Sequence, residues 1–525
     1  MAASVSERLR RAWRRLVPAV LAGAALTIGI SLLGALLGPS WHPRPYEPLV
    51  PVASDTAIGG DASAPSVGTY PTTAELAELE ISPGVVVTVQ VHAPVGAPGP
   101  LPAVVFLHGA GTADHTGFAA QGDALASAGI VAVVPDKRMD TYSTAHRDYV
   151  ASAADYHRSV EFATSLPIVD PARVGVYGES EGAYIAPIVA TEHGGSSFVV
   201  LVSAPVVPPR QQAAYAVHTY LDATGVPEPL FRLIPRALGG AFPFGVVDYA
   251  DFDPQPYQQR LTQPLLVVYG TGDNSMPQAQ GAAQLIGDAA VAGNHHVTVR
   301  YYAGANHGIR IGTSEGPLAP GFTRDLAQWV NGLPDSAAAE PQIAGARPNQ
   351  YIWAEQPPRP IGILSGNLLV ATHAIPPLLL VVGALVSLYA FVRSAALGRR
   401  REPERHSPWL PIYLATAAVL AAATWYVWIN YVLDIAVLAT SYQQDPAISF
   451  GGYEAENQVA GAASFALGVA LYSWWRGARA GRRYGRLARF GAVTATVGTL
   501  GLLLLASYWS GFPTLGWGEV VTPLP

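Results

Sequence analysis

Long apolar stretches separated by short arginine-rich segments constrain this 525-residue chain more than any other feature. The first, Leu16 to Gly38, is an uncharged run that would be about 34 Å long as a helix, enough to cross the core of a bilayer. Four more lie in the last third of the chain: Leu368 to Val392, Trp409 to Leu433, Asn457 to Trp475 and Phe490 to Trp509. We therefore expect about five transmembrane helices, one N-terminal and four C-terminal.

The basic residues predict how these helices are oriented. Residues 1–15, 393–408 and 476–489 hold 16 of the 31 Lys and Arg residues. Five crossings place these three segments on one side, and the positive-inside rule makes that side the cytoplasm. The segment 39–366 and the tail 510–525 are then extracytoplasmic. Two alternatives are buried core helices of a soluble protein, which would make this charge alternation a coincidence, and a cleaved signal peptide, which usually has a shorter apolar region.

Composition excludes several kinds of site. The chain has no cysteine, so disulfides, thiolate metal ligands and a cysteine nucleophile are excluded. From Pro39 to Asp335 there are 13 basic and 27 acidic residues, a net charge of −14 that should repel nucleic acid. Metal-binding H-E-x-x-H and phosphate-binding G-x-x-x-x-G-K patterns are absent. We predict no cofactor, no metal and no nucleic-acid partner, and we expect membrane lipid to surround the apolar helices; the oligomeric state stays open.

Strand-like and helix-like segments alternate between the first two apolar stretches, which predicts a globular domain over 72–334. The strands are apolar throughout, as in a mostly parallel sheet with helices on both faces. We expect the Pro-, Ala- and Gly-rich stretches 39–71 and 335–366 to be tethers, and 367–509 to hold the four C-terminal transmembrane helices. The predicted strands that matter most for function are Ala103–Leu107, Arg173–Tyr177, Leu265–Tyr269 and Val297–Tyr302.

In parallel sheets ligands bind beyond the carboxyl ends of the strands, and three predicted strand ends carry reactive side chains. Ser180 lies in Gly178-Glu-Ser-Glu-Gly182, a G-x-S-x-G pattern at a predicted strand-to-helix junction. Asp273 and His307 each come just after another predicted strand. A fourth strand end is followed by His108-Gly-Ala-Gly111, a turn of small residues whose backbone N–H groups are candidates to face an oxyanion.

These motifs resemble those of an α/β-hydrolase, in the group of dienelactone-hydrolase-like and prolyl-oligopeptidase-like serine esterases. The matching stretches are 106–111, 170–182, 264–273 and 304–307. The resemblance implies that Ser180 is the nucleophile, that His307 accepts its proton and that Asp273 orients the histidine. It also implies an oxyanion hole made by the backbone N–H groups of Ala110 and Glu181.

Each assignment has a competing interpretation. Ser180 could be only a helix N-cap. The other candidate acids are Asp251 and Asp253, and the other candidate histidines are His108, His295 and His296. The two glutamates beside the serine, Glu179 and Glu181, could disfavour anionic substrates, but we favour carboxylates that face solvent or pair with arginine.

An insertion over about 204–262 interrupts the strand-helix alternation, and we expect it to form a cap that governs substrate choice, or else a surface excursion packed away from the site. The leading hypothesis is a membrane-integral serine hydrolase that cleaves small-molecule or lipid-like carboxylic esters through an acyl-enzyme, outside the cytoplasm. A peptidase or a cell-envelope acyltransferase would use the same residues. The non-enzyme hypothesis is a membrane sensor or scaffold with a hydrolase-like binding domain.

Overall fold

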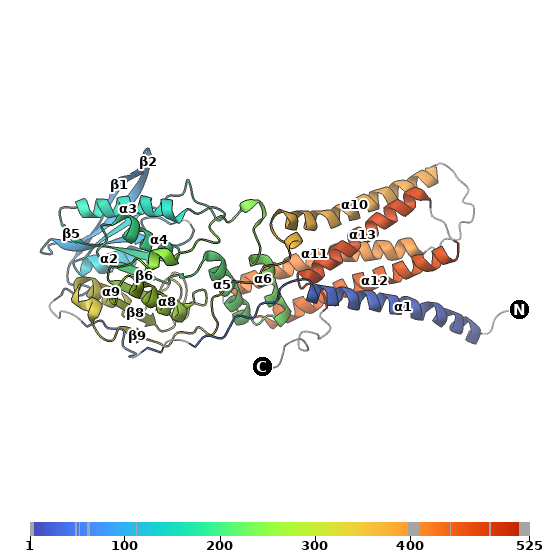
Figure 1. Ribbon diagram of the computed structural model, residues 1–525, viewed down its shortest axis with the longest axis horizontal. Coiled ribbons are helices and arrows are strands. Elements are labelled where there is room, and N and C mark those ends of the chain that lie inside the picture. The colour runs from blue at the N-terminus through green and yellow to red at the C-terminus, as the bar shows by residue number, and fades with distance from the viewer. Residues whose placement is uncertain are drawn as a thin grey trace. The chain divides into compact units, whose positions relative to one another are not determined.

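The computed structural model describes residues 5–47, 50–51, 53–59, 64–111, 113–396, 409–441, 443–481 and 485–513. The chain divides into two compact units, which are considered separately below (Figure 1). The sheet unit comprises residues 42–219 and 246–356, and the helical unit comprises the remainder. Each unit is therefore assembled from segments far apart in the sequence.

The sheet unit is built on nine strands in the order β1-β2-β4-β3-β5-β6-β7-β8-β9. β1 and β2 form an antiparallel hairpin, β2 pairs antiparallel with β4, and the other neighbouring strands are parallel. This confirms the predicted, mostly parallel sheet. The strands are β1 (Thr72–Ser82), β2 (Val85–Pro94), β3 (Leu101–Leu107), β4 (Val131–Pro135), β5 (Val169–Glu179), β6 (Val199–Val202), β7 (Leu265–Gly270), β8 (Val297–Tyr302) and β9 (Ile343–Gly345).

Helices cover both faces of this sheet. Tyr156 and Leu285 belong to an apolar core on one face, with side chains from α3, α4 and α8. Leu125 and Trp329 belong to the core on the other face, with side chains from α2 and α9. Because both faces are covered, β3, β4, β6, β7 and β8 are buried along their whole length. The helices are α2 (Ala119–Ser127), α3 (Tyr149–Ser165), α4 (Gly182–Ile188), α7 (Gln255–Gln258), α8 (Gln278–Val291) and α9 (Phe322–Asn331).

Both segments expected to be tethers contribute backbone pairing to the sheet unit. In the segment 335–366, β9 pairs with the edge strand β8, and the residues up to Gln356 belong to the sheet unit. In the segment 39–71, Pro45 bridges Ile352 and Ala53 bridges Ala344. Such short main-chain pairing depends little on side-chain type, so a Pro- and Gly-rich composition does not exclude it.

In its described ranges the helical unit contains five long helices: α1 (Val5–Leu36), α10 (Gly366–Ala396), α11 (Trp409–Thr440), α12 (Tyr453–Arg479) and α13 (Arg486–Tyr508). Four of them, α1, α10, α11 and α13, have the length and apolar composition needed to cross a membrane. We expected α12 to be a fifth, over Asn457 to Trp475, but it is not among these four. Its body is rich in Ala, Gly and Ser, and two acidic residues in its first turn and two arginines in its last turn flank that body, so the helix as a whole is less apolar than α10 or α11.

Small residues bring the long helices close together. A Cβ on Gly468 of α12 would lie 2.6 Å from the Ala22 carbonyl oxygen of α1. On α13, a Cβ on Gly498 would lie 2.5 Å from the Leu380 nitrogen of α10. Close backbone approach at small residues is typical of helix packing in membranes, where water does not drive apolar surfaces together. α12 is thus packed against α1, although it lacks the apolar composition of its neighbours.

The insertion predicted as one cap over 204–262 is divided between the two units. α5 (Pro209–Thr224) begins in the sheet unit and ends in the helical unit, and α6 (Leu233–Leu238) belongs to the helical unit. There the buried Arg236 donates hydrogen bonds to the carbonyl oxygens of Gly34 and Tyr508, at the ends of α1 and α13. Residues 246–262 return to the sheet unit. The middle of the insertion is therefore tied to the helices that we expected to lie in the membrane.

Candidate active site

Ser180 lies at the sharp turn between β5 and α4. Its φ is 54°, in the left-handed region that residues other than glycine rarely adopt. The flanking glycines make the turn possible, because a Cβ on Gly178 would lie 2.4 Å from the Gly182 oxygen and one on Gly182 only 2.2 Å from the Leu107 oxygen. A strained serine on a strand-to-helix turn is the geometry of a nucleophile elbow.

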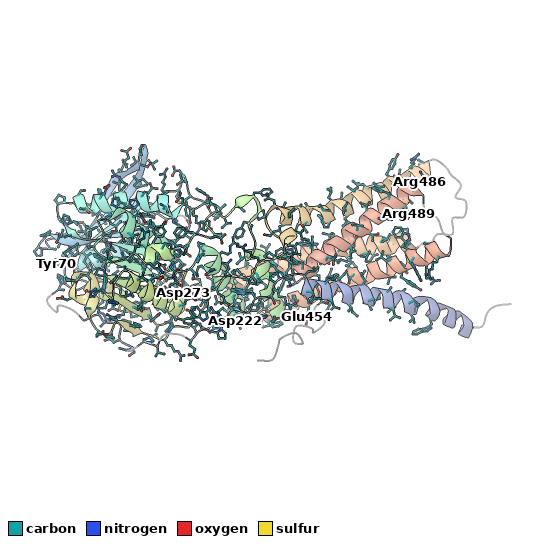
Figure 2. All side chains as sticks on the ribbon, in the orientation of Figure 1. Tyr70, Asp222, Asp273, Glu454, Arg486 and Arg489 are labelled. Carbon is teal, nitrogen blue, oxygen red and sulfur yellow. The ribbon has the colours of Figure 1, made fainter. Side chains whose placement is uncertain are left out.

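Asp273 and His307 are in direct contact. Asp273 follows β7, His307 follows β8, and the distance from Asp273 Oδ2 to His307 Nδ1 is 2.7 Å. Asp273 is buried within the sheet unit (Figure 2). Ser275 donates to Asp273 Oδ1 from its hydroxyl, at 2.6 Å, and from its backbone nitrogen, at 2.9 Å. The carboxylate is thus fixed in one orientation, and it holds the imidazole by Nδ1.

The carboxyl end of β6 connects the serine turn with the histidine loop. The backbone nitrogen of Ser180 donates to the Val202 oxygen at 2.9 Å. The next residue, Ser203, donates its hydroxyl to the His307 carbonyl oxygen at 2.7 Å. Two adjacent residues of one strand end therefore hold the serine and the histidine. In the described part of the chain the Ser180 hydroxyl makes no hydrogen bond, so the proton-transfer contact with His307 is not formed in this state.

Charges around His307 favour its protonated form. Burial lowers the pKa of the His307 imidazole, but the charge and hydrogen bond of Asp273 and the charge of Glu179 outweigh burial and raise that pKa to about 8. Burial raises the pKa of Asp273, but His307 and Ser275 outweigh it, so the pKa of this carboxyl is lowered. The pair is therefore arranged to stabilise an imidazolium, as a general base requires once it has taken up a proton.

The turn after β3 lies directly against the serine. A Cβ on Gly109 would be 3.2 Å from the Ser180 Cβ. Among the described residues, neither the backbone N–H of Ala110 nor that of Glu181 donates a hydrogen bond to another part of the protein. Both predicted oxyanion donors thus lie beside the serine with their N–H groups unengaged.

The Glu181 carboxylate does not face solvent, contrary to one of the two arrangements expected from the sequence. Its side chain is only 3% exposed, and it accepts hydrogen bonds from Lys137, Tyr142 and Arg147 at 2.8, 2.8 and 3.0 Å. The expected arginine pairing is present, but it occurs in the interior together with the single lysine of the chain. Glu179 accepts a hydrogen bond from the Tyr177 hydroxyl at 3.1 Å. No local pattern signals the Glu181 contacts, because the partners precede it by 34 to 44 positions.

The competing candidates have other partners. His108 Nε2 donates to the Pro135 oxygen at 2.7 Å, and burial lowers its pKa to about 4, so it is a neutral structural residue. Asp251 pairs with Arg210 at 2.6 Å. Asp253 accepts from the backbone nitrogen of Gln255 at 3.1 Å. The remaining alternatives, His295 and His296, are exposed and precede β8. Of the candidate acids, Asp273 is the one in contact with a histidine.

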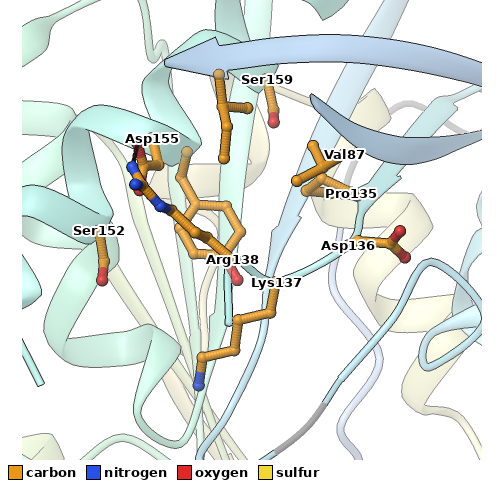
Figure 3. Close-up of a pocket in the computed structure, with 10 residues that line it drawn as sticks. Val87, Pro135, Asp136, Lys137, Arg138, Ser152, Asp155 and Ser159 are labelled. Carbon is orange, nitrogen blue, oxygen red and sulfur yellow. Dashed lines mark hydrogen bonds and ion pairs between the residues drawn. The ribbon is translucent and has the colours of Figure 1, made fainter. Parts of the chain in front are cut away.

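Figure 3 shows side chains, Lys137 among them, that line a cavity. This cavity is too small to hold an ester substrate. Its volume is about 20 Å³, the space of about one water molecule. The Lys137 amino group points away from Arg138 and Asp155, which also line the cavity (Figure 3). In the described ranges, no group of three His, Asp or Glu side chains is placed to hold a metal ion.

Residues 155–331 match the family model described as "BAAT / Acyl-CoA thioester hydrolase C terminal". This stretch runs from α3 to α9 and includes Ser180, Asp273 and His307. A search of curated proteins finds no match.

Solved structures similar to this chain include a dipeptidyl aminopeptidase IV-like protein from Bacteroides ovatus, with 17% identity and a TM-score of 0.34 over 51% of this chain and 36% of that one. This chain therefore spans about a third of that protein. A dienelactone hydrolase-like protein from Klebsiella pneumoniae has 16% identity and a TM-score of 0.33 over 46% of this chain and 88% of that one. An esterase from the archaeon Pyrobaculum calidifontis has 20% identity and a TM-score of 0.33, and the match covers 46% of this chain and 78% of the esterase. Independently of these similarities, the mostly parallel sheet covered by helices, with reactive residues after β5, β7 and β8, is the architecture that the motifs indicated.

Proposed function

We propose that this α/β-hydrolase domain is a serine hydrolase that cleaves carboxylic esters through an acyl-enzyme. The observation that carries the proposal is the contact between the buried Asp273 and the half-buried His307, fixed through the end of β6 beside a serine on a strained turn. A binding module would need neither the strain nor the ion pair. The strained backbone costs free energy, and a carboxylate that raises the pKa of a neighbouring histidine is typical of active sites.

The roles follow from the geometry. His307 is held by Nδ1, so Nε2 is the nitrogen that takes the Ser180 proton as the hydroxyl attacks the carbonyl carbon. The Ala110 and Glu181 N–H groups stabilise the tetrahedral oxyanion. His307 then returns the proton to the leaving group, and water repeats these steps to release the acid from Ser180.

Thioesters are a second candidate substrate class, favoured by the match of 155–331 to a model described by acyl-CoA thioester hydrolysis. The same residues would act, since only the leaving group changes from an alcohol to a thiol. A peptidase or an acyltransferase to a cell-envelope acceptor would differ in the leaving group or in the acceptor. We infer a membrane-integral enzyme whose catalytic domain lies outside the cytoplasm, supported by four apolar helices and by the arginine distribution.

Fluorophosphonate labelling tests the proposal. The wild-type protein should be labelled covalently, and Ser180→Ala and His307→Ala should lose at least about 99% of the labelling rate, because nucleophile and base act as a unit. Ser165→Ala is the matched control: this serine is exposed on α3, and among the residues that the structure describes its hydroxyl bonds only the Phe162 oxygen of its own helix. Labelling of Ser180→Ala at the wild-type rate would refute the enzyme assignment and favour a sensor or scaffold. Ester and acyl-thioester substrates should then be compared on the full-length protein.

A further inference from the structure

A buried polar cluster lies behind the predicted oxyanion turn. It consists of Lys137, Tyr142, Arg147 and Glu181, with Glu181 at its centre. The side chains of Lys137 and Glu181 are 5% and 3% exposed. The Lys137 ammonium also lies 3.7 Å from the centre of the Tyr142 ring, and the Arg147 guanidinium lies 4.5 Å from the centre of the Tyr249 ring. Every cation of the cluster therefore has both an anionic and an aromatic neighbour.

The cluster holds the oxyanion turn on both sides of Ala110. Lys137 Nζ donates to the carbonyl oxygen of Gly109 at 2.8 Å. The backbone nitrogen of Gly111 donates to the Tyr142 hydroxyl at 3.0 Å. Both side chains donate in turn to the same Glu181 oxygen, Oε2, at 2.8 Å. One carboxylate oxygen thus connects the residue before Ala110 with the residue after it.

This arrangement also links the two predicted oxyanion donors. One is the N–H of Ala110, held between the two bonds described above. The other is the N–H of Glu181 itself, whose side chain anchors those bonds. The turn benefits from such fixing, because Gly111 has a φ of +94° and glycine is the residue with the widest choice of backbone conformations.

Stability alone does not explain a buried cluster of this kind. Burial lowers the pKa of the Lys137 amino group and Glu181 opposes that shift, so the ion pair offsets a desolvation cost. Apolar side chains of similar volume often stabilise a fold at least as well. The ends of the two side chains bond the oxyanion turn, and an apolar replacement could not do this.

We infer that Lys137 and Tyr142, anchored by Glu181, are positioning residues that hold the Ala110 and Glu181 N–H groups at one oxyanion site. This inference rests on the proposed function. Oxyanion donors act only at about 2.7–3.1 Å from the developing charge, so a small displacement of the turn weakens transition-state binding more than substrate binding. The cluster should therefore affect kcat and leave KM nearly unchanged.

Tyr142→Phe is the sharpest test. It keeps the ring beneath the Lys137 ammonium and removes only the hydroxyl that bonds Gly111 and Glu181. We expect kcat for an ester substrate to fall about tenfold, less than the loss of an oxyanion donor itself, with KM within about twofold. The affinity for a trifluoromethyl ketone, which forms an oxyanion on the serine, should fall by the same factor as kcat.

The matched control is Tyr70→Phe, because the Tyr70 hydroxyl makes no hydrogen bond in the part of the chain that the structure describes. This variant should keep the wild-type kcat and ketone affinity. A wild-type kcat in Tyr142→Phe would overturn the inference. A rise in KM that accounted for the whole loss of kcat/KM would overturn it too.

A second pair of variants separates positioning from folding. Lys137→Met removes the bond to Gly109 and leaves Glu181 short of one partner, so both Tm and kcat should fall. Arg138→Met is the comparison variant, because it breaks a partly buried ion pair with Asp155 but removes no bond to the oxyanion turn, so it should lower Tm and leave kcat at the wild-type value. If Lys137→Met lowers kcat no more than Arg138→Met does, the cluster is only structural and the inference fails. Labelling that depends on Ser180 in all these proteins keeps that outcome distinct from a failure of the proposed function.

Discussion

At the scale of single residues, His307 is the group whose charge state should control activity. Burial lowers the pKa of its imidazole, but Asp273 and Glu179 outweigh burial and raise it to about 8. Only the neutral imidazole can take up the serine proton. The same negative charges that stabilise the imidazolium during the reaction therefore also keep the resting base protonated below about pH 8.

The first prediction is that kcat/KM rises with pH, with a midpoint near pH 8, because this ratio reports the ionisation of the free enzyme. Glu179→Gln removes one negative charge that favours the imidazolium, so the midpoint should move to lower pH. We expect a shift of roughly half a pH unit, equivalent to about 0.7 kcal/mol. Hydrolysis rates measured from pH 5.5 to 10 for both proteins would check this.

Glu78→Gln is the control for the loss of a carboxylate, because Glu78 is exposed on β1. Its profile should coincide with that of the wild type. A midpoint that moves upward in Glu179→Gln, or that does not move, would mean that Glu179 does not act on His307.

The reactive side chains could be predicted from the sequence, whereas the cluster that supports them could not. Ser180, Asp273 and His307 each follow an apolar strand, and the carboxyl ends of parallel strands meet at one edge. The partners of Glu181 follow no such rule. Lys137 comes just after β4, with α3 and β5 between it and Glu181, so only the folded chain shows that they meet. Exposure was a reasonable expectation for a glutamate, and it is wrong for Glu181 because two cations and a phenol compensate its burial.

At the scale of elements, the junctions β3–turn and β5–α4 pack through backbone rather than through side chains. The closest approach is at Gly182, where an added Cβ would lie 2.2 Å from the Leu107 oxygen. The carbonyl group of Leu107 immediately precedes the oxyanion turn. A displacement there would move the turn away from the serine.

The second prediction, at the scale of elements, compares two glycines. Gly182→Ala should destabilise the protein by about 1–3 kcal/mol through overpacking and should slow fluorophosphonate labelling, because the Cβ meets backbone that cannot rotate away. Gly287→Ala, in the interior of α8 with nothing within 4 Å of the new Cβ, should stabilise the protein by about 0.5–1 kcal/mol. Thermal melting and labelling rates of the two variants would be compared with wild type. Similar melting temperatures for both would show that the junction can relax.

The strands could be predicted from the sequence where burial in the core makes them apolar. The central strands β3 and β7 are apolar and β8 is buried along its whole length, because helices cover both faces, and the positions of these strands agree with the sequence to within a few residues. The edge strand β1 shows no such pattern, since most of its side chains are exposed. β9 has three residues in a Pro- and Gly-rich segment, too short for any periodicity to show.

At the scale of the whole molecule, the positions of the ends of the long helices can be compared with the predicted membrane topology. Within the helical unit, the start of α1, the end of α10, the end of α12 and the start of α13 lie at the same end of the helices (Figure 1). Arg486 and Arg489 lie at this end of α13 (Figure 2). The structure does not describe the arginines between α10 and α11, the arginines at 482–483 or the tail 514–525.

α12 decides whether the chain crosses the membrane five times. Its composition alone does not qualify it, because Glu454, Glu456, Arg476 and Arg479 flank a body rich in Ala, Gly and Ser. Packing makes a membrane location possible for this less apolar helix, since a helix in contact with α1 and α11 exposes less of its surface to lipid. We therefore propose that α12 crosses, so that the segments on either side of it face opposite compartments.

The final prediction follows from the absence of cysteine, which makes every introduced thiol unique. Ser441→Cys lies between α11 and α12, and Ala480→Cys lies just after α12; both positions are exposed. In intact cells a membrane-impermeant maleimide should label Ser441→Cys, and it should label Ala480→Cys only after permeabilisation, because α12 and the positive-inside rule place position 480 in the cytoplasm. Ser165→Cys, on the exposed surface of α3, reports the side of the catalytic domain and should behave as Ser441→Cys does. Equal labelling of positions 441 and 480 in intact cells would mean that α12 does not cross, and labelling of Ala480→Cys alone would invert the proposed orientation.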